Sequence, residues 1–137
     1  MRRTELNMTL RRWIYRFLAL LWMAAIYWLS SRETLPIPDL FLGQDKIEHA
    51  VAFGILALLF ALSFGNGKGK IHPRRLIILA LLVTLYGFSD EVHQYFVPGR
   101  DASFWDFCAD ATGSFLAAFC FLRRREKTSR EEVIPAP

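Results

Sequence analysis

Apolar residues along this chain fall into four runs that are separated by charged or turn-forming segments. The runs cover residues 13–30, 47–64, 76–95 and 105–122, which are lengths typical of helices that cross a bilayer. The third run reaches this length only if its helix continues from Ser89 through Asp90, Glu91 and Gln94. The pattern predicts an all-α fold, an integral membrane four-helix bundle.

Turn-forming residues mark where the predicted helices end. Pro36 and Pro38 end the first helix and give an extended linker, and Val97-Pro98-Gly99 breaks the third. A glycine- and lysine-rich turn over residues 65–70 separates the second and third. The first run follows basic residues, as the apolar part of a signal peptide does, but no small-residue cleavage site follows it. We interpret it as a retained span.

Basic residues predict the orientation of the bundle. All but three of the 17 Lys and Arg residues lie in residues 1–16, in residues 65–75 or after Leu122. By the positive-inside rule, both termini of this multi-pass protein are cytoplasmic. Residues 1–12 form a basic cytoplasmic segment and residues 123–137 a polar cytoplasmic tail, which we expect to be disordered after Glu126. Because the basic residues flank apolar runs, they favour membrane topology over a nucleic-acid partner.

Ionisable residues near the outer ends of these spans are the candidate chemistry. An ionisable group in hydrocarbon costs about 2.5 to 3.5 kcal/mol, so it is rarely kept without a partner or a task. In the predicted topology the second and fourth helices begin, and the third ends, at the outer face. A polar pocket open to the outer leaflet would then bring together Asp45, Lys46, His49, Glu91, Gln94, Asp106 and Asp110, with Arg100 on the loop above. His49 and Glu91 are the candidate catalytic residues, and the others are candidate ligand-binding residues.

Structural explanations exist for the same residues. Asp45, Glu48 and Asp106 suit the first turn of a helix, where an acid interacts favourably with the helix dipole. Glu91 and Asp110 lie deeper, so we expect both to be buried. An Arg100–Asp110 or a Lys46–Glu91 ion pair could staple the helices together. Two small residues, Gly113 and Ala117, continue the face of Asp110 and would let a neighbouring helix approach closely.

Four short motifs occur in order along this part of the chain. They are Asp45-Lys46-x-x-His49, Glu91-x-x-Gln94, Pro98-Gly99-Arg100 and Asp106-x-x-x-Asp110-x-x-Gly113. In these motifs the chain resembles the VanZ-like family over about residues 40–122. The family is named for a protein associated with teicoplanin resistance, so the resemblance implies a role in the cell envelope and in glycopeptide susceptibility. It also implies a multi-pass protein of the bacterial inner (cytoplasmic) membrane. Family members often carry Asn where this chain has Asp110, which adds a negative charge to the predicted pocket.

The first functional hypothesis is recognition, with or without modification, of a polar or anionic headgroup at the outer leaflet. A membrane lipid or a lipid-linked cell-wall precursor is the ligand class. Arg100 and Lys46 would hold its phosphate or carboxylate, because a guanidinium offers a bidentate fork. His49 with Glu91 or Asp45 would supply a base and its orienting partner.

Other classes of function stay open. One histidine and several carboxylates could hold Mn²⁺, Zn²⁺ or Mg²⁺ in a metal-dependent hydrolase, although a second histidine would be expected for a tight zinc site. No other cofactor is expected. A non-enzymatic scaffold would use the polar network only to specify helix packing. A transporter fits least, because four short spans leave little room for alternating access.

Overall fold

The computed structural model describes residues 2–33, 40–65 and 71–133, with side chains in residues 6–33, 40–65 and 71–124. This part of the chain forms four helices and no strand: α1 (Arg2–Ser30), α2 (Gln44–Phe64), α3 (Pro73–Tyr95) and α4 (Phe104–Val133). The all-α prediction is confirmed. The break at Val97-Pro98-Gly99 separates α3 from α4. The linker prolines and the turn at residues 66–70 lie outside the described residues.

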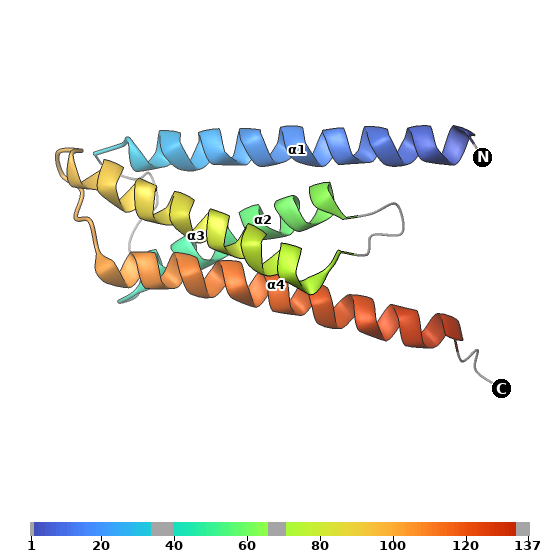
Figure 1. Ribbon diagram of the computed structural model, residues 1–137. Helices are drawn as coiled ribbons and strands as arrows, with labels where there is room; N and C mark the ends of the chain where they lie inside the picture. Colours follow the sequence, from blue (N-terminus) through green and yellow to red (C-terminus); the bar gives the residue numbers. More distant parts are fainter. Residues whose placement is uncertain (1, 34–39, 66–70, 134–137) are drawn as a thin grey trace.

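The helices lie lengthwise in one bundle, and Figure 1 shows which ends they share. α2 and α4 begin, and α1 and α3 end, at one end of the bundle, which we call the carboxylate end because it contains His49, Glu91 and Asp110. α1 and α3 begin, and α2 and α4 end, at the other, which we call the arginine end because it contains Arg16 and Arg75. The side of the membrane that each end faces stays a prediction.

Three of the described helices are long and apolar enough to cross a membrane: α1 from Leu6 onward, α2 and α3. Their outward faces carry large exposed apolar side chains, among them Leu81, Leu85 and Phe88 on α3. Such a surface suits contact with lipid rather than with water. These features identify an integral membrane protein. α4 does not reach the same apolar character over its described residues, so its crossing of the membrane stays a prediction.

Two helices extend well beyond the predicted spans. α1 begins at Arg2 rather than near Trp13, and α4 continues to Val133. The expected disorder after Glu126 is therefore wrong as far as Val133. Hydropathy marks where apolar residues stop, whereas a helix continues through Arg, Glu and Lys, which have high helix propensity.

Close approach of α2 and α4 organises the bundle, and this pair has the most extensive contacts. A methyl group at Gly113 of α4 would overlap the backbone oxygen of Ala50 on α2. A methyl group at Gly54 of α2 would lie 3.2 Å from the backbone oxygen of Gly113. The prediction that small residues on α4 permit close packing is confirmed. Beneath the carboxylate end an apolar core contains Ala19, Ile26, Phe53, Leu56, Ala57 and Val83.

Candidate functional site

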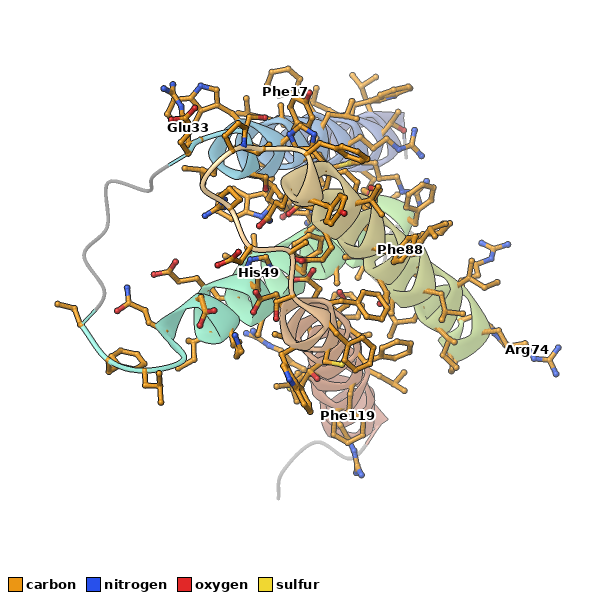
Figure 2. All side chains as sticks on the ribbon, turned by 90° about the vertical axis from the view of Figure 1, so that its left-hand side faces the viewer. Phe17, Glu33, His49, Arg74, Phe88 and Phe119 are labelled. Atoms are coloured by element: carbon orange, nitrogen blue, oxygen red, sulfur yellow. The ribbon has the colours of Figure 1, made fainter. Side chains whose placement is uncertain are left out.

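The centre of the carboxylate end is a histidine–aspartate pair between α2 and α4. His49 lies in the second turn of α2, and its Nδ1 is 2.9 Å from Oδ1 of Asp110 in the second turn of α4. Asp110 is completely buried, and the His49 side chain is 16% exposed. Figure 2 looks onto this end of the bundle and shows His49 near its middle. The pair is therefore enclosed by helices while the histidine keeps an exposed edge.

Glu91 of α3 completes a cluster of three ionisable side chains. Its Oε1 lies 3.8 Å from His49 Nδ1, and its Oε2 accepts a hydrogen bond of 2.8 Å from the backbone N–H of Ser103. Glu91 is buried, so the expected burial of Glu91 and Asp110 is confirmed. Glu91 Oε1 and Asp110 Oδ2 are buried without a hydrogen-bond partner. A buried polar atom without a partner costs about 1 to 3 kcal/mol, which makes this cluster a candidate site for a proton or a cation.

Gly87 of α3 makes the room that Asp110 occupies. A methyl group at Gly87 would lie 2.7 Å from Asp110 Oδ2 and 2.9 Å from Asp110 Cβ. Any larger residue at this position would push the carboxylate away. The position of Asp110 is thus fixed from two sides, by His49 on α2 and by the bare backbone of α3.

Lys46 forms a second connection between α2 and α4, one turn nearer the end of the bundle. Its Nζ is 2.7 Å from Asp45 Oδ2 and 3.0 Å from Asp106 Oδ1. The Asp106 side chain is only 8% exposed, so its role exceeds that of a solvated charge at a helix start. The predicted Lys46–Glu91 staple is not found among the described residues. Because α2 and α4 start together, Lys46–Asp106 and His49–Asp110 follow each other as successive connections.

Arg100 lies in the loop between α3 and α4 and is half-buried. Its backbone N–H donates to the oxygen of Val97, which closes the turn after α3. No described contact joins its guanidinium to Asp110, whose partner is His49, so the predicted Arg100–Asp110 staple is wrong within the described part of the chain. The loop reaches the cluster through the backbone N–H of Ser103, which donates to Glu91.

Gln94 belongs to a different network, between α1 and α3. Its Nε2 donates to Asp90 Oδ2 at 2.8 Å, and Ser30 Oγ of α1 donates to the same oxygen at 2.9 Å. All three side chains are buried. The structure therefore places Gln94 beside the His49 cluster rather than in it. Asp90 and Gln94 are four residues apart on one helix face, a spacing that could have indicated this pairing.

Sequence reasoning also missed Ser103. It begins α4, because Trp105 N donates to Ser103 Oγ at 3.2 Å and Asp106 N to its backbone oxygen at 3.1 Å. The segment Ser103-Phe104-Trp105-Asp106 has a capping residue three positions before an acid, which resembles the signal of a helix N-terminus. That signal could have placed Ser103 beside Glu91.

The cluster can hold a proton or a metal ion. With two carboxylate oxygens facing Nδ1 of His49, a hydrogen on Nδ1 is the favoured arrangement, and Nε2 of the neutral ring is left as an acceptor. One ligand atom each from His49, Glu91 and Asp110 lie within 4.8 Å of one another, so these three side chains are candidate ligands of one divalent cation.

Comparison with known proteins gives one match. Residues 1–125 match the family model described as VanZ/LLP1, which covers most of the chain. No curated protein and no solved structure matches the chain.

Proposed function

This chain belongs to the VanZ/LLP1 family, and from this premise we propose that it binds the polar or anionic headgroup of a lipid-linked cell-wall precursor. The site is the carboxylate end, facing outward from the bacterial inner membrane, with both termini in the cytoplasm. By acting on such a precursor the protein would alter glycopeptide susceptibility, teicoplanin included. Two features support this proposal: the family and the enclosed His49–Asp110 pair.

The His49–Asp110 contact of 2.9 Å is the observation that carries a proton-transfer role. Asp110 is the orienting partner of the histidine, in place of the Glu91 or Asp45 that the sequence suggested. With Nδ1 directed at the carboxylates, Nε2 can accept a proton from a hydroxyl group of the headgroup or from water. The positive charge then formed on the ring would be stabilised by Asp110 and by the unpartnered oxygen of Glu91.

Headgroup binding would use the basic residues nearest the cluster along the chain, Lys46 and Arg100. Lys46 already shares its charge between Asp45 and Asp106, which leaves it less able to attract an anion. Arg100 is therefore the better candidate for holding a phosphate through its fork of N–H groups. The acids of the His49 cluster suit the other part of such a ligand, because carboxylates accept hydrogen bonds from sugar hydroxyls and amides.

A metal-dependent hydrolase is the second candidate function. It is favoured by the close grouping of His49, Glu91 and Asp110 and by the two carboxylate oxygens without a partner. A divalent ion would replace the hydrogen on Nδ1, and these three residues would be its ligands. With one nitrogen and the remaining donors oxygen, the set suits Mn²⁺ or Mg²⁺ better than a tight zinc site.

The experiment compares His49→Gln with His93→Gln. His93 also lies near this end, but it contacts Ser31 and Tyr27 rather than the cluster, which makes it a matched control. Cells with either variant are tested for teicoplanin susceptibility, and the purified proteins for melting temperature in detergent. We expect His49→Gln to lose the wild-type phenotype at an almost unchanged melting temperature, and His93→Gln to keep it.

Two results would contradict the proposal. If His49→Gln keeps the phenotype, the histidine does no chemistry. If it melts far below the wild type and little protein reaches the membrane, the cluster is a structural scaffold. Metal content after a chelator wash separates the two candidate functions. One equivalent of metal in the wild type, lost in His49→Gln, would favour the hydrolase, and none in either would favour proton transfer.

A further inference from the structure

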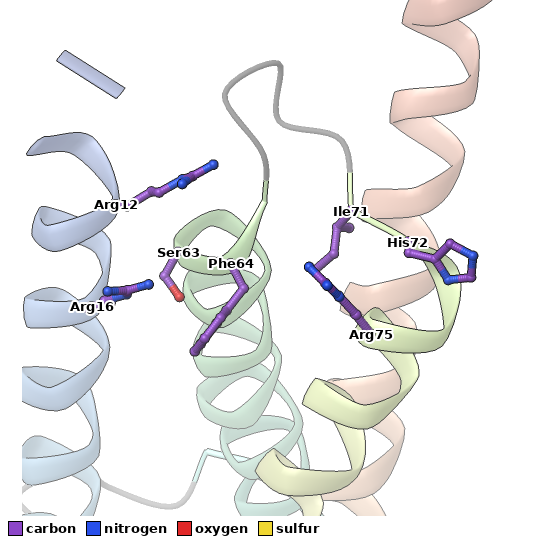
Figure 3. Close-up of a pocket in the computed structure, with 7 residues that line it drawn as sticks. All are labelled: Arg12, Arg16, Ser63, Phe64, Ile71, His72 and Arg75. Carbon is purple, nitrogen blue, oxygen red and sulfur yellow. The ribbon is translucent and has the colours of Figure 1, made fainter. Parts of the chain in front are cut away.

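A second polar site lies at the arginine end, far from the His49 cluster. Between α1, the end of α2 and the start of α3 is a cavity of about 440 Å³. Figure 3 shows the side chains that line it, including Arg12 and Arg16 from α1 and Arg75 from α3. The volume is within the range of sites that bind small molecules.

The cavity gathers positive charge without a carboxylate among its described lining residues. Arg12 and Arg16 are four residues apart, so they share one face of α1, and Arg75 comes from a different helix. Like charges on one cavity wall repel one another, and an anion or water is needed to balance them. No described lining residue supplies the counter-charge.

Arg16 is held in place by aromatic rings rather than by acids. Its guanidinium carbon lies 4.8 Å from the ring centroid of Trp13 and 5.4 Å from that of Phe64. Its Nε is buried without a hydrogen-bond partner. Stacked guanidinium groups keep their N–H edges free for a ligand, and a planar fork of donors matches the oxygens of a phosphate.

The ends of two helices also face this region. α3 begins at Pro73, and the positive end of its dipole favours an anion, although the N–H of Arg74 is already bonded to His72 Nδ1 at 3.2 Å. α2 ends at Phe64, and the negative end of its dipole attracts cations. That second effect amounts to about half a charge, which is too little to balance three arginines.

We propose that this cavity binds a phosphate group, supplied by the headgroup of an anionic phospholipid in the leaflet at the arginine end. Basic cavities between membrane helices near the bilayer surface are suited to such headgroups. Arg12 and Arg16 bind the phosphate from α1, and Arg75 binds it from α3. The site is independent of the proposed function, because no residue is shared with the carboxylate end.

The test compares arginines that line the cavity with neighbouring arginines of the same helix that do not. Arg16→Gln is compared with Arg11→Gln, and Arg75→Gln with Arg74→Gln, since Arg11 and Arg74 lie outside the cavity lining. Arg74 and Arg75 are both exposed, so the second pair is also matched in exposure. Binding of phosphatidylglycerol, cardiolipin and phosphatidylcholine to the detergent-purified protein is measured by native mass spectrometry. We expect about tenfold weaker binding of the two anionic lipids in each lining variant, and less than twofold change in each control.

Inorganic pyrophosphate distinguishes a lipid from a soluble source of the phosphate. If pyrophosphate displaces cardiolipin only weakly, the lipid is the ligand. If pyrophosphate displaces cardiolipin at comparable concentrations, the phosphate comes from a soluble compound and the lipid proposal is wrong. Equal weakening in lining and control variants would overturn the site, because the effect would then be general surface charge. Unchanged lipid binding in folded Arg16→Gln and Arg16→Lys would also overturn the proposed site. If these variants melt at a lower temperature, Arg16 only stabilises the packing of α1 against the end of α2.

Discussion

At the scale of single residues, two buried polar networks lie side by side at the carboxylate end and differ in how fully they are satisfied. In one, Asp90 Oδ2 accepts hydrogen bonds from both Ser30 and Gln94. In the other, oxygens of Glu91 and Asp110 stay without a partner. A satisfied network specifies packing, whereas buried groups with unused hydrogen-bonding capacity are typical of functional sites. We therefore propose that the Asp90 network stabilises helix packing and that the His49 cluster is the functional site.

Neighbouring serines test the structural assignment. Ser30→Ala removes a buried donor to Asp90, while Ser31→Ala changes an exposed residue whose hydrogen bonds, to the backbone oxygen of Tyr27 and to His93 Nε2, are open to water. We expect Ser30→Ala to lower the free energy of unfolding by about 1.5 to 3 kcal/mol and Ser31→Ala by about 0.5 kcal/mol or less. Thermal unfolding in detergent measures both. Equal effects would show that the Ser30–Asp90 contact contributes nothing particular to stability.

The meeting of His49, Glu91 and Asp110 could be predicted from the sequence, but their pairing could not. Three spans of known direction bring their ends to one depth, which is enough to gather these residues. Which atoms touch depends on how each helix is rotated and shifted, and one residue of shift moves a side chain by 1.5 Å along the axis and 100° around it. Hydropathy leaves both quantities open. For that reason the sequence does not distinguish Glu91 from Asp106 as the partner of Lys46.

At the scale of helices, the distance between α2 and α4 sets the geometry of the site. Both connections between these helices, Lys46–Asp106 and His49–Asp110, cross the same closely packed pair. Gly113 contacts α2 one turn below Asp110, where its bare backbone meets Ala50. Separating the helices at this point would pull Asp110 away from His49.

Alanine at Gly113 tests that dependence. In an unconstrained helix Gly→Ala stabilises by about 0.5 to 1 kcal/mol, but here the added methyl group overlaps the backbone of Ala50. We expect Gly113→Ala to destabilise by about 1 to 3 kcal/mol and to lose function. Gly54→Ala, whose methyl group would lie 3.2 Å from its neighbour, should have a smaller effect, and the exposed Thr112→Ala almost none. A Gly113→Ala protein as stable as the wild type would show that α2 and α4 can separate freely.

The limits of the helices were harder to predict than their number. Apolar runs located all four, and Val97-Pro98-Gly99 located the break between α3 and α4. The ends of α1 and α4 extend through charged residues, where hydropathy carries no signal although helix propensity stays high. The start of α4 depends on a local capping contact of Ser103, which a hydropathy pattern does not contain.

At the scale of the whole molecule, the two ends of the bundle have opposite chemistry. The carboxylate end gathers acids around one histidine, and the arginine end gathers three arginines around a cavity. This polarity agrees with the positive-inside rule if the arginine end faces the cytoplasm. The proposed precursor site and the proposed phospholipid site would then lie in opposite leaflets.

Reporter fusions test this orientation. Fusions of alkaline phosphatase, which is active only outside the cytoplasm, are made after Arg32, Gly65, Arg100 and Leu122. We expect activity after Arg32 and Arg100 and none after Gly65 and Leu122, because the basic segments stay in the cytoplasm. A fluorescent protein that folds only in the cytoplasm serves as the reciprocal control. Phosphatase activity after Leu122 would disprove a cytoplasmic C-terminus and the outward position of the carboxylate end.

The contact between Asp110 and His49 also bears on how the chain is made. α1, α2 and α3 are long and apolar enough to cross a bilayer, whereas the described part of α4 does not reach that apolar character and carries Asp106 and Asp110 near its start. A carboxylate deep in a lone helix costs roughly 2.5 to 3.5 kcal/mol on insertion scales. Synthesis proceeds from the N-terminus, so Lys46, His49 and the gap over Gly87 already exist when α4 leaves the ribosome. We therefore expect α4 to insert last, and its insertion to depend on contacts with the helices already in the bilayer. When α4 is grafted alone onto another protein, we expect it to remain outside the bilayer.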